Sequence, residues 1–159
     1  MPRDARDAAL ESLLLMERRG AWSDGSVKRI VAQAGLDSRD AALCARMTYG
    51  VVQNRLLLDF DLAQVVSSPL AKLQPVVLDI LRLGAYQILF LDKIPVSAAV
   101  NEAVEQTKTY ANKRAAGLVN GSLRALARQK DTLAAPQDLA TKYSHPQPLV
   151  DCLRASMDG

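Results

Sequence analysis

The chain has 159 residues, which is enough for one ordinary domain with a buried core. With 49% hydrophobic, 23% charged and 4% aromatic residues, its composition excludes a disordered chain and favours a soluble helical one. The net charge of +3 at pH 7 permits an anionic partner but does not require one.

Cysteine content and the first residues bear on the compartment. Cys44 and Cys152 lie far apart with no second thiol nearby, which excludes a disulfide framework and a zinc site. The N-terminus is charged from the outset and has no apolar secretory segment behind it. We therefore expect a cytoplasmic protein.

The first quarter of the chain predicts two short helices. Apolar residues recur at helical spacing over residues 3–17, and this helix should end near Gly20. The same spacing returns over residues 27–34, and Gly35 then stands where glycine commonly follows a helix end.

Residues 38–66 predict a third helical segment, for which Asp37 or Ser38 is the expected cap. The pattern fits either one long helix or two helices with a break near residues 50–55. Pro69 follows the segment and cannot continue it.

Residues 75–91 form the most apolar stretch and predict a central helix that begins with proline. Asp79, Arg82 and Tyr86 fall on its one recurrent polar stripe, so we expect burial on most sides. The stretch is slightly too short for a membrane span and contains two charges, so we expect no membrane insertion.

The rest of the core predicts two more helices. Residues 92–95 form a turn, after which Ser97 can cap a sixth helix. Residues 112–114 link it to a last core helix that continues to about residue 128. We therefore expect an all-α bundle of about seven helices around the central one.

Two glycines inside the last helix need an explanation. Gly117 and Gly121 lie four residues apart on one helix face, and each costs about 1 kcal/mol relative to alanine. Close approach of a neighbouring helix would offset this cost, and Gly84 of the central helix is the expected counterpart.

Beyond the core the composition changes to a proline-rich tail. We divide the chain into a helical domain over residues 1–130 and, over residues 131–159, a linker with the start of a further domain. A short apolar, helix-like run over residues 149–157 marks the start of a new element, so we expect a continuation beyond Gly159.

The residues predict no active site. The sequence has no glycine-rich phosphate loop, and its one histidine, His145, lies between Ser144 and Pro146 with no metal-ligating cluster beside it in the sequence. We expect no metal site, no cofactor in this chain and no catalysis by it alone.

Basic residues stand at the start of two predicted helices: Arg3 and Arg6 at the first, Lys113 and Arg114 at the last. The helix macrodipole disfavours positive charge there unless an anion is shared with the free backbone N–H groups. If folding brings the two starts together, they would form a cradle for a phosphate backbone. Scattered surface charges are the alternative explanation.

Several motifs together resemble the NusB family of all-helical RNA-binding domains, over about residues 3–128. They are LRLGAYQIL at residues 81–89, IP at 94–95, AVNEAVE at 99–105 and GLVNG at 117–121. Asn101 and Asn120 stand in the last two motifs, and we expect them to be buried and hydrogen-bonded in structural roles.

The closer similarity is to the N-terminal domain of Sun/Fmu-type ribosomal RNA cytosine-C5 methyltransferases. Residues 113–120 resemble that form of the last motif, and residues 143–146 resemble the entry to the catalytic domain. Pro148 replaces the tryptophan common there. The resemblance implies a catalytic domain, absent from this chain, that binds S-adenosylmethionine.

The resemblance therefore implies a domain that docks RNA, expected to be 16S ribosomal RNA, for its own catalytic domain. A free-standing NusB-like antitermination factor that binds RNA and a small ribosomal protein is the alternative, and a helical protein-interaction module is a third. Whether the domain forms a homodimer stays open. The expected RNA contacts are Arg3, Arg6, Arg82, Lys108, Lys113 and Arg114.

Overall fold

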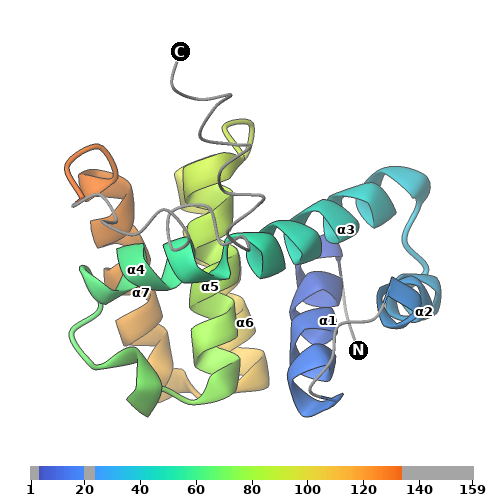
Figure 1. Cartoon of the computed structure of the whole chain (residues 1–159), viewed down its shortest axis with the longest axis horizontal. Coiled ribbons are helices and arrows are strands. Elements are labelled where there is room, and N and C mark those ends of the chain that lie inside the picture. The colour runs from blue at the N-terminus through green and yellow to red at the C-terminus, as the bar shows by residue number, and fades with distance from the viewer. Residues whose placement is uncertain (1–3, 20–23, 134–159) are drawn as a thin grey trace, which may run out of the picture.

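A computed structural model describes residues 4–19 and 24–133 of the chain. The described residues form seven α-helices and one short 3₁₀-helix, with no strand (Figure 1). The predicted all-α class is therefore confirmed. In chain order the elements are α1 (Ala5–Arg19), α2 (Asp24–Ala34), α3 (Ser38–Gln53), α4 (Arg55–Ala63), η1 (Leu70–Lys72), α5 (Pro75–Phe90), α6 (Val96–Tyr110) and α7 (Lys113–Gln129).

The helix ends follow mostly from local chemistry. Gly35 ends α2 with a φ of 67°, a conformation that glycine adopts without steric cost. The side chain of Asp37 accepts a hydrogen bond of 2.8 Å from the backbone N–H of Asp40 and so caps α3. A break at Asn54 separates α3 from α4. Pro95, rather than the expected Ser97, is the cap of α6.

Helix α5 is the centre of the bundle. It packs against α1, α3, α4, α6 and α7, and residues 79 to 88 are all buried. The polar stripe of this helix is included, because Asp79, Arg82 and Tyr86 are exposed by only 2%, 4% and 7%. The expected burial is therefore confirmed, and the buried charges of α5 must be compensated by neighbouring helices.

Gly84 lies where α5 packs against Leu123 of α7. A Cβ atom at this position would come within 2.6 Å of Cδ1 of Leu123, a fully buried side chain on α7. Since that distance is well inside van der Waals contact, any side chain at residue 84 would push the two helices apart or force Leu123 out of its place.

Gly117 and Gly121 do not serve this contact, and the expectation that a helix packs against them is wrong. Both lie on the exposed side of α7, and nothing comes within 4 Å of a Cβ built at either position. Asn101 is also exposed, contrary to the burial expected for it, and Asn120 is half-buried. The family motifs therefore include residues that face outward.

The described part of the chain ends shortly after α7, at residue 133. Most of the predicted linker, with His145, Pro148 and Cys152, lies outside it. No helix among the described residues is long and apolar enough to cross a membrane.

We predict that Gly84→Val will lower the free energy of unfolding by about 1–3 kcal/mol, because the added methyl groups overpack the α5–α7 contact. Gly121→Ala is the matched control and should raise it by up to about 1 kcal/mol, because its Cβ meets open space within a helix. Urea denaturation of both variants measures the difference; equal effects would contradict the packing described for Gly84.

Candidate functional site

Helix α7 carries a strong positive charge. It contains Lys113, Arg114, Arg124 and Arg128, and no aspartate or glutamate. The excess positive charge of this one helix therefore exceeds the net charge of +3 of the whole chain. Charge of one sign gathered on one element raises the local potential, which is the electrostatic requirement of a surface that binds polyanions.

These charges flank a smooth strip of helix surface. Arg114, Gly117, Gly121, Arg124 and Arg128 follow one another at intervals of three and four residues, so they share one face of α7, and all five are exposed. The two glycines carry no side chain there. A ligand can therefore approach the backbone of α7 between the arginines at either end.

The start of α7 combines a polar cap with two exposed cations. The side chain of Asn112 accepts a hydrogen bond of 2.9 Å from the backbone N–H of Ala115. Lys113 and Arg114 follow directly, and the first turn contains no acidic residue. Since the helix macrodipole already makes this end positive, an anion bound here would be stabilised by both sources of charge.

The other predicted cations differ in their surroundings. Lys108, in the last turn of α6, is exposed and forms an ion pair of 3.7 Å with Glu105. Arg6 is half-buried, and its Nε donates a hydrogen bond of 2.7 Å to Oε1 of Gln87. Arg3 lies outside the described residues.

The predicted cradle between two basic helix starts is not formed. Figure 1 shows α1 beginning at the end of the bundle where α5 ends, and α7 beginning at the opposite end. The contacts agree. Arg6, near the start of α1, donates a hydrogen bond to Gln87, near the end of α5. Tyr110, three residues before the start of α7, donates instead to Glu11, which lies further along α1. Lys113 and Arg114 therefore belong to the α7 surface alone.

Arg82, one of the expected RNA contacts, is buried in a cluster of three carboxylates. Its Nε and Nη2 donate to the two oxygens of Asp59 at 2.7 and 2.9 Å. Its Nη1 donates to Asp79 at 3.1 Å and to Glu17 at 3.4 Å. The guanidinium thus joins α1, α4 and α5, and little of it is left for a ligand.

Asp79 is the carboxylate of this cluster whose negative charge is least favourable. Burial, together with the negative charge of Glu17, raises the pKa of Asp79 to about 7, although Arg82 opposes the shift. Its Oδ2 is buried without a hydrogen-bond partner among the described residues. A protonated Asp79 could donate from this atom to Glu17, so the proton both removes one charge and satisfies the orphaned oxygen.

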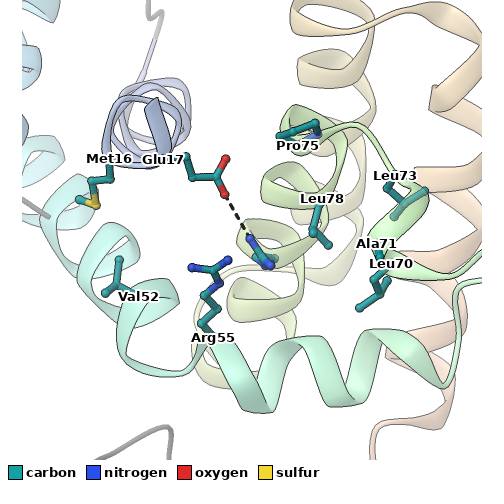
Figure 2. Close-up of a pocket in the computed structure, with 10 residues that line it drawn as sticks. Met16, Glu17, Val52, Arg55, Leu70, Ala71, Leu73, Pro75 and Leu78 are labelled. Atoms are coloured by element: carbon teal, nitrogen blue, oxygen red, sulfur yellow. Dashed lines mark hydrogen bonds and ion pairs between the residues drawn. The ribbon is translucent and has the colours of Figure 1, made fainter. Parts of the chain in front are cut away.

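A hollow of about 540 Å³ opens beside the cluster, between the ends of α1 and α3 and the start of α5 (Figure 2). Its walls are largely apolar, with Val52, Leu73 and Leu78 among them. Figure 2 shows Arg55 extending from the start of α4 toward the ion pair of Glu17 and Arg82. The hollow contains no pairing of nucleophile and base.

Cys44 and the potential metal ligands are the other groups with chemistry of their own. Cys44 is fully buried, and burial raises the pKa of its thiol, which makes it unreactive. Among the described residues, no group of three or more histidine, cysteine, aspartate or glutamate side chains could hold a metal ion. The feature of the described residues that points to a ligand is the positive charge of α7, which suits an anion.

Arg124 and Arg128 belong to the basic face of α7 and are absent from the residues selected from the sequence. The signal was present, because both continue the helical spacing of Arg114 and no acidic residue interrupts residues 113–129. Gly117 and Gly121 lie on the same face, and packing against another helix would equally explain glycine there, so the sequence alone does not show that this face is exposed.

Comparison with known proteins gives one family for the helical region. The sequence model of the NusB family matches residues 3–128 of this chain. The probable ribosomal RNA small subunit methyltransferase B of Bacillus subtilis (strain 168) is 38% identical over 150 residues, which cover 91% of this chain and 33% of the relative. The chain thus spans about a third of the length of the first curated relatives it matches.

Shorter relatives match as well. The transcription antitermination protein NusB of Dehalococcoides mccartyi (strain ATCC BAA-2266 / KCTC 15142 / 195) is 28% identical over 127 residues, which cover 79% of this chain and 89% of the relative. Among solved structures, NusB of T. maritima superposes with a TM-score of 0.72 at 26% identity, covering 81% of this chain and 92% of that one.

A chain in the crystal structure of antitermination factors NusB and NusE in complex with dsRNA has a TM-score of 0.71 at 23% identity. It covers 78% of this chain and 93% of that one, and at this identity the likeness concerns the fold.

We predict that stability will fall as the pH rises from about 5 to about 8, because the folded state holds a proton on Asp79 that the unfolded state releases near pH 4. The contribution of this group is present below the unfolded pKa and is lost as the pH rises through about 7. Its size is on the order of 2–4 kcal/mol.

Asp79→Asn mimics the protonated group and should remove most of this slope, while Asp92→Asn, at an exposed carboxylate, should leave it unchanged. Urea denaturation of the three proteins across this pH range measures the effect. A slope in Asp79→Asn equal to that of the unaltered chain would contradict the assignment.

Proposed function

Because the chain belongs to the NusB family, we propose that it is an RNA-binding domain that docks 16S ribosomal RNA for a cytosine-C5 methyltransferase. The catalytic part of that enzyme would lie outside this chain and would be its intramolecular partner. On this proposal the domain positions the substrate and takes no part in methyl transfer.

The observation that carries the proposal is the basic face of α7. RNA presents a regular row of phosphates, and binding releases the counterions condensed along them. Arg114, Arg124 and Arg128 supply charge along one exposed helix face, and the two glycines between them let a sugar–phosphate backbone come close to the helix. Contacts of this kind position RNA without reading its sequence.

The α7 start extends the same surface. Lys113 is exposed beside Arg114, and Lys108 precedes them at the end of α6. The backbone N–H groups of the first turn add donors that suit phosphate oxygens. Of the other residues expected to bind RNA, Arg6 lies toward the opposite end of the bundle and Arg82 is buried in its ion pairs.

The relatives support the methyltransferase setting. The B. subtilis protein, whose printed name is that of a ribosomal RNA methyltransferase, is 38% identical across 91% of this chain, whereas the D. mccartyi NusB is 28% identical across 79%. S-adenosylmethionine would be the methyl donor of such an enzyme.

A second candidate is a NusB-like antitermination factor that binds RNA together with a small ribosomal protein. The D. mccartyi NusB supports it, because 89% of that relative is covered by the match. The gene distinguishes the two: a reading frame that continues past the codon of Gly159 into a methyltransferase domain favours the first, and a stop codon there favours the second.

We predict that the double variant Arg114→Glu/Arg124→Glu will bind a structured fragment of 16S ribosomal RNA at least about tenfold more weakly at low salt. The plot of log affinity against log salt should also become less steep, by about one unit for each phosphate contact removed. Fluorescence anisotropy across a salt series measures both quantities.

Arg29→Glu/Lys72→Glu makes the same change of charge at two exposed positions on α2 and η1 and serves as the control. It should alter affinity much less. An unchanged affinity of the α7 variant, or an equal loss in the control, would show that α7 does not carry the RNA.

A further inference from the structure

A second surface, at the C-terminal end of α5, combines an exposed aromatic ring with cations. A hollow of about 610 Å³ lies between the first half of α3 and the turn that joins α5 to α6. Phe90, the last residue of α5, lines it with 38% of its surface exposed. None of the basic residues selected from the sequence lines this hollow, and neither do those of α7.

The ring of Phe90 is held in place from one side. It stacks on the buried ring of Tyr86, with centroids 5.1 Å apart and an angle of 21° between the ring planes. An exposed phenylalanine supported in this way is a rigid platform, on which a second flat ring can stack at little cost in conformational entropy.

Three cations line the same hollow: Arg39 and Arg46 on α3, and Lys93 in the turn. All three are exposed, and none of them forms an ion pair with another described residue. Arg39 and Arg46 stand two helical turns apart, about 10 Å along α3, so together they can follow an extended anionic chain.

The remaining lining residues complete a nucleotide-like environment. Leu43 and Ile94 provide apolar walls, and the carboxylates of Asp40 and Asp92 can accept hydrogen bonds from exocyclic amino groups or from a 2′-hydroxyl. A base within a duplex is already stacked on its neighbours, so only an unpaired base can be placed on the ring of Phe90.

We propose that this hollow, called here the Phe90 site, binds an unpaired base of a single-stranded RNA segment, with Phe90 as the stacking platform and Arg39, Arg46 and Lys93 on the flanking phosphates. The inference rests on the proposed RNA-binding function and deepens it. The α7 face would hold RNA by its backbone, and the Phe90 site would favour RNA that has a single-stranded region.

The test compares two labelled RNAs by fluorescence anisotropy: a single strand of about 12 nucleotides and a blunt duplex of the same length. Phe90→Leu keeps an apolar side chain and removes the aromatic ring. It should weaken binding of the single strand by about 5- to 100-fold and leave binding of the duplex unchanged. Phe90→Tyr should retain the affinity, because it keeps the ring.

Val96→Ala is the matched control. Val96 has the same exposed fraction as Phe90, 38%, but does not line the hollow, so its variant should bind both RNAs as the unaltered chain does. Arg46→Gln should make the salt dependence of single-strand binding less steep by about one unit. Thermal unfolding of each variant establishes that the fold is retained.

Photocrosslinking gives a second readout that needs no substitution. A single strand that carries 5-iodouridine, which couples to adjacent aromatic rings, should crosslink to the peptide that contains Phe90. Crosslinks confined to other peptides would overturn the proposal. So would a Phe90→Leu variant that binds the single strand normally, or one that loses both RNAs equally.

The outcomes separate this inference from the proposed function. If the unaltered chain binds neither RNA, the proposed function fails and the Phe90 site fails with it. If the chain binds the duplex through α7 but single-strand binding does not depend on Phe90, the Phe90 site alone is wrong. An acidic peptide remains another class of ligand for this hollow, and that second result would favour it.

Discussion

One buried guanidinium holds three helices of this domain together. Arg82 of α5 pairs with Asp59 of α4, Asp79 of α5 and Glu17 of α1, so a single cation faces three carboxylates, of which Asp79 is buried and the other two are partly exposed. Removal of Arg82 would leave the buried carboxylate of Asp79 beside Glu17 without a cation, which is costly. The raised pKa of Asp79 relieves the excess negative charge, because a bound proton turns one carboxylate into a hydrogen-bond donor.

Helix α5 positions both proposed binding surfaces: α7 packs along its side, and the Phe90 site lies at its C-terminal end. Gly84 lets α7 pack tightly along α5 through Leu123, and this contact leaves the arginines of α7 facing outward. At the end of α5, the ring of Phe90 is partly exposed and stacks on the buried ring of Tyr86. The buried part of the central helix is thus structural, and binding is assigned to the surfaces that it positions.

Periodicity alone predicts the helices, because apolar positions recur at helical spacing in the buried central helix and in its amphipathic neighbours. It could not predict the fate of Arg82, since its partners Asp59 and Glu17 are 23 and 65 residues away in the sequence. Periodicity also could not decide between one long helix and the two helices α3 and α4, because the apolar pattern fits both. The sequence does not show whether Gly117 and Gly121 face a neighbouring helix or solvent, and only the fold places them on the open face of α7.

The most direct test of the account is an NMR titration of the ¹⁵N-labelled chain with a ribosomal RNA fragment that contains a helix and a single-stranded loop. We expect the largest amide shifts along the exposed face of α7 and around the turn after Phe90, with little change near Arg82. Shifts confined to other helices, or no shifts at low salt, would contradict the assignment of RNA binding to these surfaces.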